Sequence, residues 1–134
     1  MRSDGWSGAG WLCSFSSVEQ WRNRSIAFHF TDEASASQIL QSGFIRPSRQ
    51  FENRRGATKP AGVYASFVHP FAAENDIERI KEKLFFKPKV KVIDAFVVIR
   101  LSGDWIALSD AELIAPNPVF DKRYEIVGIG VWKP

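Results

Sequence analysis

Cysteine and histidine are scarce in this chain, and their scarcity limits its chemistry. Cys13 is the only cysteine, so an intrachain disulfide is excluded. His29 and His69 are the only histidines. With so few soft or imidazole ligands, a structural zinc site is not expected, and we predict no metal site.

Long apolar runs are also missing. No segment approaches the roughly twenty apolar residues that a helix needs to span a bilayer. The first residues, Met1 to Trp6, lack the apolar run of a signal peptide. We therefore expect no membrane contact and a cytoplasmic site of action, with delivery into a target cell by a signal-independent route left open.

Several common catalytic motifs are absent from the sequence. It contains no GxxxxGK[ST] loop, GxGxxG, HExxH or GxSxG, so the mechanisms tied to those motifs are not expected. The formal net charge of +3 is small. It favours anionic ligands such as nucleotides, but it falls short of the basic stripe of a dedicated nucleic-acid binder.

The length and the apolar content fit one globular domain. The chain has 134 residues, 45% of them hydrophobic, with five Trp and eleven Phe. We predict a single domain over residues 1–134, in which the Gly- and Ser-rich segment 1–10 is loosely ordered.

Strand patterns outnumber helix patterns, and the two do not alternate regularly. Helices are predicted at 17–24, at 33–42 before Gly43, and after Pro70. Strands are predicted at 27–31, 62–67, 90–101 and 124–132, with a short strand or turn at 110–114. This order indicates an α+β fold with a mostly antiparallel or mixed sheet.

Two of the predicted strands carry polar side chains at a two-residue period. In the first, His29 and Thr31 alternate with phenylalanines, and in the second Tyr64 and Ser66 share a face. These matching faces predict that His29 and Tyr64 line one cleft for a planar, polar ligand. Taken alone, each has a structural explanation, a half-buried histidine bonded to backbone and a packed tyrosine.

Charged candidates follow at two further places. The segment 46–61 reads as a mobile cationic loop, in which Arg46 and Arg49 are best placed to pair with a phosphate. Glu125 is predicted to share a face of the last strand with Val127, Ile129 and Val131. That carboxylate either lies in water at the rim of the sheet or is held there for a function.

The order of these motifs resembles the ADP-ribosyltransferase superfamily. His-Phe-Thr on a strand, a helix, Gly-Phe-Ile-Arg-Pro-Ser, a basic loop, Gly-Val-Tyr-Ala-Ser and a late glutamate follow one another over residues 26–132. The similarity is to the His-Tyr-Glu branch, which diphtheria toxin shares with the poly(ADP-ribose) polymerases, and most of all to small bacterial toxin-type members. It implies a split β-sheet with a few short helices around an NAD cleft.

The resemblance also implies roles for individual residues. His29 would bond the ribose on the adenosine side of NAD, Tyr64 would stack on nicotinamide, and Glu125 would stabilise the charge that develops on the nicotinamide ribose. These three are the implied catalytic residues. The implied NAD-binding residues are His29, Phe30, Thr31, Arg46, Ser48, Arg49, Tyr64, Ala65, Ser66 and Phe71.

Two positions depart from the pattern of the superfamily. The second tyrosine of this branch is replaced by Asn75, so Phe67 or Phe71 would take over the stacking. Arg123 stands where the arginine-modifying branch carries a second acid, which disfavours arginine as the acceptor.

The function implied is that of an NAD-dependent mono-ADP-ribosyltransferase, acting as a toxin or effector on a protein or nucleic acid. A neutralising immunity protein is a candidate partner. Three alternatives stay open: an NAD hydrolase, an RNA 2′-phosphotransferase, and a non-catalytic module that binds a nucleotide or single-stranded nucleic acid. If Glu125 is not the acid, Asp104, Asp110 and Glu112 are the next candidates.

Overall fold

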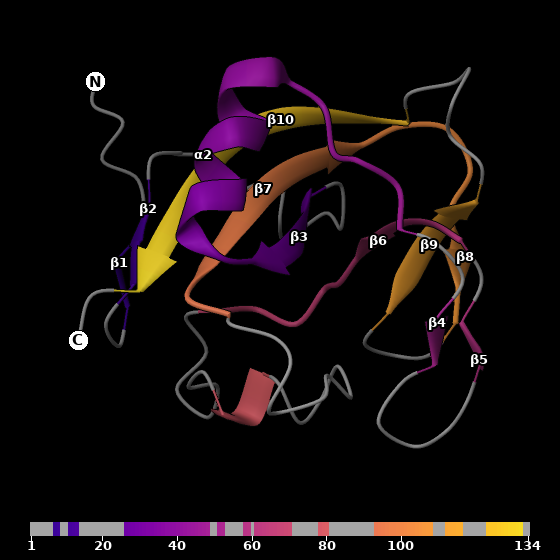
Figure 1. Cartoon of the computed structure of the whole chain (residues 1–134), viewed down its shortest axis with the longest axis horizontal. Helices are drawn as coiled ribbons and strands as arrows, with labels where there is room; N and C mark the ends of the chain where they lie inside the picture. Colours follow the sequence, from indigo (N-terminus) through magenta and orange to yellow (C-terminus); the bar gives the residue numbers. More distant parts are fainter. Residues whose placement is uncertain are drawn as a thin grey trace.

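Two antiparallel sheets of unequal size, a separate two-stranded hairpin and one well-defined helix make up most of the described part of the chain (Figure 1). The computed structural model describes residues 7–8, 11–13, 26–48, 51–52, 58–59, 61–70, 78–80, 93–108, 112–116 and 123–132. This arrangement confirms the α+β class. Within that part of the chain, no helix is long and apolar enough to cross a membrane.

The larger sheet has five strands in the order β1-β2-β10-β7-β3, all paired antiparallel. Its strands are β1 (Ser7–Gly8), β2 (Trp11–Cys13), β3 (Ile26–Thr31), β7 (Ala95–Leu101) and β10 (Tyr124–Trp132). Ala95 to Ile99 are all buried, because β7 lies between β10 and β3 and is covered on both faces. The prediction of a central, doubly covered strand is confirmed, although β7 begins later than residue 90.

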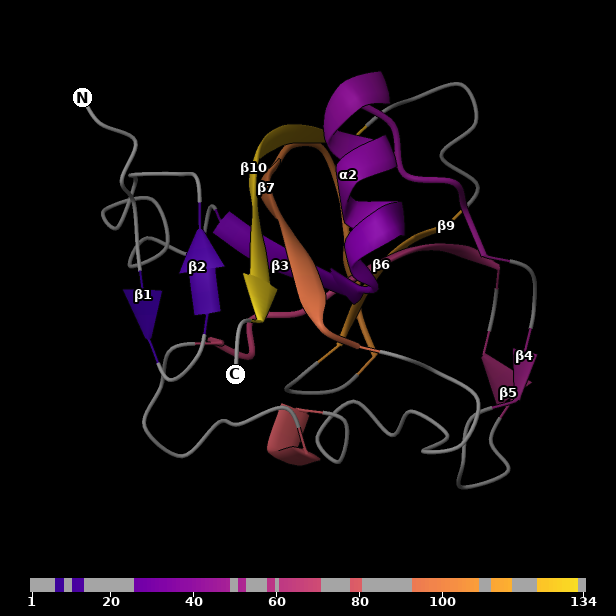
Figure 2. The same ribbon diagram turned by 60° about the vertical axis from the view of Figure 1, so that its left-hand side comes forward.

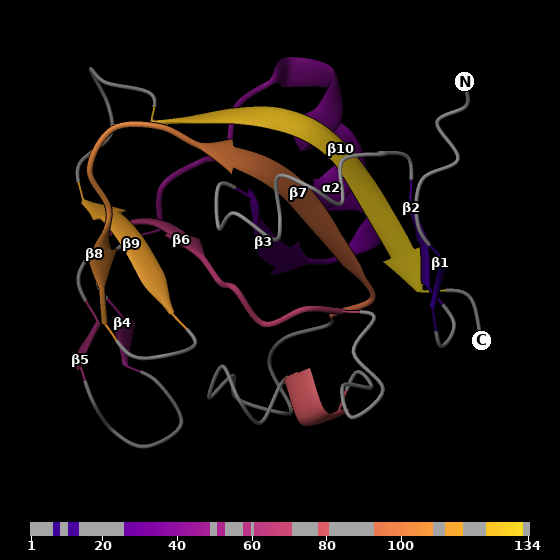
Figure 3. The same ribbon diagram turned by 180° about the vertical axis from the view of Figure 1, so that it is seen from behind.

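The smaller sheet has three strands in the order β6-β9-β8 and lies at the other end of the molecule from β1 and β2 (Figure 3). Its strands are β6 (Gly62–Ala65), β8 (Ile106–Ala107) and β9 (Leu113–Pro116). The strand expected at 110–114 is thus found slightly later. Two short strands, β4 (Phe51–Glu52) and β5 (Thr58–Lys59), form a separate hairpin.

Helix α2 (Glu33–Ser42) has the predicted bounds, and local signals explain both ends. The Asp32 carboxylate caps the first turn by accepting the Ser35 N–H at 2.8 Å. Thr31, just before the cap, is the last residue of β3. Gly43 ends the helix in the left-handed conformation at φ 74°, which glycine adopts without strain.

The core has two layers, one on each face of the larger sheet. We call the layer that α2 covers the α2-side core (Figure 2); its buried residues are Ala27, Ala36, Ile39, Ile45, Val63, Ala65, Ala95, Val97, Ile99, Leu113 and Tyr124. We call the opposite layer the far-side core; its buried residues are Ile26, Phe28, Phe30, Ile80, Ile93, Phe96 and Val98. Residues 78–80, the described part of the helix predicted after Pro70, contribute Ile80 to this layer. The helix predicted at 17–24 lies outside the described residues.

A β-bulge divides β10 into two halves. Ile126 pairs with Ile99 and Gly128 with Val98, so Val127 is an extra residue without its own partner on β7. The extra residue reverses the alternation of faces, and Ile129 and Val131 therefore pack on the α2 side. At Gly130 a Cβ would collide with the Phe96 ring, which explains the glycine there.

The N-terminal segment is described only in part. Within residues 1–10, Ser7–Gly8 form β1 and pair with β2. The rest of the segment expected to be loosely ordered lies outside the described residues.

Candidate functional site

The two sheets meet where β3 passes the end of β6. Phe28 and Ser66 exchange two backbone hydrogen bonds, each 2.8 Å long, in an isolated antiparallel bridge. We call the surroundings of this bridge, with His29 on one strand and Tyr64 on the other, the sheet junction. It brings together two sequence segments that were predicted to cooperate.

His29 contacts the second strand directly. Its Nδ1 lies 2.7 Å from the main-chain oxygen of Tyr64. A carbonyl oxygen can only accept, so Nδ1 carries the hydrogen and Nε2 of the neutral ring is an acceptor. The bond is the one expected of a half-buried strand histidine, and it also fixes the ring beside the strand that carries Tyr64.

The side chains of His29 and Tyr64 do not share a face, which corrects the prediction. His29 pairs with Val97 and so lies on the α2 side, whereas Phe28, and with it Ser66, lies on the far side. Tyr64 is two residues before Ser66 and projects on the same side of β6 as Ser66. A ligand touching both rings would therefore cross the edge at which the sheets part, rather than lie on one face.

Tyr64 is partly buried beside an acidic group. Burial, and then the negative charge of Glu112, raises the pKa of the Tyr64 phenol to about 12. The phenol therefore stays neutral at physiological pH. It offers an uncharged aromatic face and a hydroxyl donor.

Glu112 is the buried carboxylate of this region, with only 9% of the residue exposed. It directly precedes β9, and its main-chain oxygen accepts the Leu108 N–H at 2.9 Å. Ala65 pairs with Leu113, so extending the register by one residue sets Glu112 opposite Ser66. Glu112 is thus two strands from β3, about 10 Å away across the sheets.

Glu125, the predicted catalytic acid, lies elsewhere. It pairs with Arg100, which in turn pairs with Ile26, so it projects on the far side of the larger sheet. From His29 it is separated by about 10 Å along the strands and about 10 Å across them, on the opposite face. Its side chain is 64% exposed and forms an ion pair with Arg100. The predicted common face with Val127 is confirmed, but the part of the prediction that named Ile129 and Val131 is wrong, because the bulge at Val127 reverses the alternation.

The remaining predicted contacts on the two strands are mostly buried. Thr31, Phe30 and Ala65 are buried, the first beside Ala95 and the others in the two cores. Ser66 is only 2% exposed, and its Oγ accepts the Val68 N–H at 2.9 Å. These buried side chains support the main chain of the junction and are not available to contact a ligand. The Ser66 hydroxyl holds the main chain that follows β6.

Only some of the predicted phosphate-binding residues lie within the described part of the chain. Arg46 is exposed in the segment that follows α2, and Ser48 is tied to Gly62 by backbone bonds. Arg49 and Phe71 lie outside the described residues, as does Asn75.

His69 belongs to the far-side wall of the junction. Its ring meets Phe28 edge-on at 5.5 Å, and burial lowers its pKa to about 4. The ring is therefore neutral at physiological pH. Among the described residues, no group of three His, Cys, Asp or Glu could hold a metal ion.

Comparison with family models, with curated proteins and with solved structures gave no match.

Two residues gain importance only from the structure. Glu112 ranked among three fallback acids in the sequence, where its sole distinction was to stand directly before an apolar run. Tyr124, whose hydroxyl bonds Ile45 across 79 positions of sequence, had no local signal at all.

Proposed function

We propose that this chain is an NAD-dependent mono-ADP-ribosyltransferase that transfers ADP-ribose from NAD to a macromolecular acceptor and releases nicotinamide. The observation that supports the proposal is that His29 and Glu112 both neighbour Tyr64, one on each side of the sheet junction. The His29 ring bonds the Tyr64 main-chain oxygen at 2.7 Å, and the charge of Glu112 acts on the Tyr64 phenol. These are the residue types of the His-Tyr-Glu branch, with the acid moved from Glu125 to Glu112.

The reaction breaks the bond between C1′ of the nicotinamide ribose and the nicotinamide nitrogen. The bonding electrons leave with nicotinamide, which becomes neutral, while positive charge develops on the ribose. A nucleophilic atom of the acceptor bonds to C1′ and gives up its proton to solvent. The enzyme therefore needs a negative charge beneath the sugar and a clamp on the ring that leaves.

Glu112 meets the first requirement better than Glu125. A carboxylate withdrawn from water interacts more strongly with a developing positive charge than one screened by solvent. Glu112 is buried beside Tyr64, whereas Glu125 is exposed and already paired with Arg100.

Tyr64 and His29 would hold the nicotinamide end of NAD in place. The neutral phenol ring of Tyr64 would stack on nicotinamide, and Nε2 of His29 would accept a hydrogen bond from a ribose hydroxyl. In an antiparallel strand alternate residues direct their N–H and C=O to the same edge. Because Phe28 directs its groups to Ser66, Phe30 directs its own to that edge too, where they would bond the carboxamide of nicotinamide.

The resemblance to toxin-type members of the superfamily also suggests a biological role. The enzyme would act as a toxin or effector in the cytoplasm of a target cell, with a neutralising immunity protein as its partner. The phosphotransferase alternative finds less support, since His69 is neutral and packed against Phe28, unsuited to binding a phosphate by charge.

The test is to incubate the purified protein with NAD labelled in its adenine, with and without cell lysate. We expect nicotinamide release together with label in an acid-precipitable macromolecule, which mass spectrometry would then identify. Free ADP-ribose without a labelled macromolecule would assign an NAD hydrolase instead. Absence of nicotinamide release in both conditions would contradict the proposal.

A further inference from the structure

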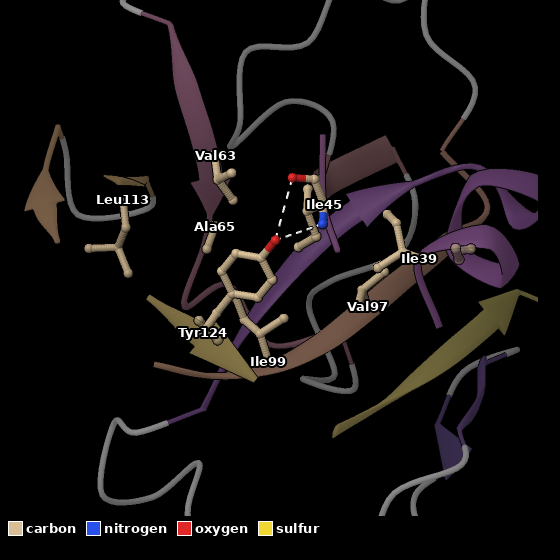
Figure 4. Close-up of a cluster of buried hydrophobic side chains, with 11 residues drawn as sticks. Ile39, Ile45, Val63, Ala65, Val97, Ile99, Leu113 and Tyr124 are labelled. Atoms are coloured by element: carbon tan, nitrogen blue, oxygen red, sulfur yellow. Dashed lines mark hydrogen bonds between the residues drawn. The ribbon is translucent and has the colours of Figure 1, made fainter. Parts of the chain in front are cut away.

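The segment after α2 is fastened to the core by one tyrosine. Tyr124, the first residue of β10, is only 4% exposed, and its hydroxyl oxygen accepts the Ile45 N–H at 2.7 Å. The same hydroxyl donates a longer hydrogen bond to the Ile45 main-chain oxygen, at 3.4 Å. Figure 4 shows the Tyr124 ring among side chains from β6, β7 and β9, with its hydroxyl directed at the Ile45 main chain.

A second anchor holds the segment three residues later. Ser48 donates its N–H to the Gly62 oxygen at 2.8 Å and accepts the Gly62 N–H at 3.1 Å. Its Oγ also donates to the Gly62 oxygen, at 3.0 Å. Gly62 has φ 154°, and a Cβ there would lie 2.7 Å from the Ala115 oxygen, so the close approach of β6 to β9 requires glycine at this position.

Arg46 lies between the two anchors. Ile45 before it is 1% exposed in the α2-side core, whereas Arg46 itself is exposed. Gly62 begins the strand that carries Tyr64, so the segment runs beside the sheet junction. Along the chain, the Cα of Arg46 is at most about 7 Å from that of Ser48.

We propose that Tyr124 is a positioning residue: its hydroxyl fixes the main chain at Ile45 so that Arg46 is presented to the pyrophosphate of NAD. The inference rests on the proposed function of the junction. A guanidinium on a fixed main chain loses less conformational entropy on binding a phosphate than one on a mobile loop. Tyr124 therefore acts through Arg46 and touches no ligand itself.

The variant that isolates this role is Tyr124→Phe. It keeps the ring in the core and removes only the hydroxyl, which leaves the buried Ile45 N–H without its acceptor. We expect the KM for NAD to rise about 3- to 10-fold with kcat nearly unchanged, because pyrophosphate contacts act alike in the ground and transition states. Hydrogen exchange of the Ile45 amide should become faster.

The experiment compares wild type, Tyr124→Phe, Arg46→Ala and the double variant. If Tyr124 acts through Arg46, the double variant should have the KM of Arg46→Ala, within about twofold. Ile80→Val serves as a control that lowers stability in the far-side core, and its KM should equal that of wild type.

Two results would overturn the inference. A KM unchanged in Tyr124→Phe but raised in Arg46→Ala would leave Tyr124 a purely structural residue. Fully additive effects in the double variant would show that Tyr124 acts on NAD by another route. If wild type itself neither cleaves nor binds NAD, the proposed function fails as well, and the uniform lack of activity in all four proteins separates that case from the first two.

Discussion

The sheet junction and the Arg100–Glu125 end of the larger sheet each hold a glutamate, but in opposite environments. At the junction Glu112 is buried beside a neutral phenol, on the strand next to the one that meets β3. At the other place Glu125 stands in solvent and is neutralised by Arg100 on the next strand. The comparison teaches that burial and neighbours, rather than a place late in the chain, decide which carboxylate can act on a substrate.

The largest expected effect comes from changing the two glutamates in the same way. Glu112→Gln keeps the shape and removes the charge, so it should lower the rate of nicotinamide release by roughly two to three orders of magnitude. Glu125→Gln, the matched control, should keep a rate within about twofold of wild type. Steady-state release of nicotinamide from NAD measures both, and the opposite ranking would return the catalytic role to Glu125.

At Tyr64 the ring and the hydroxyl can be separated. Tyr64→Ala should weaken the binding of NAD roughly 10-fold or more, since stacking on a flat ring contributes about 1–3 kcal/mol. Tyr64→Phe should bind NAD nearly as well, because the ring remains and the phenol carries no charge. Calorimetric titration with NAD gives both affinities. A strong loss in the Phe variant would show that the hydroxyl, and not the stacking face, holds the ligand.

The junction should also make the fold sensitive to acid. The pKa of His69 is lowered to about 4 in the folded chain, against 6.5 for an ordinary histidine. The unfolded chain therefore binds this proton first, and the free energy of unfolding should fall as pH drops from about 6.5 to about 4. Urea unfolding at several pH values should show a shallower decline in His69→Phe, and equal slopes in the two proteins would remove His69 as the cause.

The smallest effect is expected at the exposed end of the sheet. The Arg100–Glu125 pair is open to solvent, and such pairs contribute about 0–1 kcal/mol. A double-mutant cycle with Arg100→Gln and Glu125→Gln, followed by urea unfolding, should give a coupling within that range. A coupling energy of several kcal/mol would mean that the Arg100–Glu125 pair contributes substantially to stability, contrary to its exposure to solvent.

The elements that could be predicted from sequence are those that local signals define. The bounds of α2 follow from Asp32 and Gly43, and those of β10 from its apolar run and its glycines. The facing of β3, with Phe28 and Phe30 away from His29, is also confirmed, because it follows from the two-residue period alone.

What could not be predicted depends on partners distant in sequence. The bulge at Val127 is a mismatch between β10 and β7. A glycine inside a strand, such as Gly128, marks either a bulge or a close approach, so the sequence did not predict that Ile129 and Val131 lie on the other face from Glu125. The burial of Glu112 arises where β9 pairs with β6 and β6 meets β3. Neither of these strand pairings can be recognised from the periodicity of the sequence.

A structure of the Glu112→Gln variant crystallised with NAD would test the central claim most directly, since this variant should bind NAD without consuming it. We predict that the nicotinamide ring lies against Tyr64, with C1′ of its ribose facing the side chain at position 112 and a ribose hydroxyl within hydrogen-bond distance of His29 Nε2. NAD bound beside Arg100 and Glu125 instead, or no NAD bound at the junction at millimolar concentration, would contradict the account.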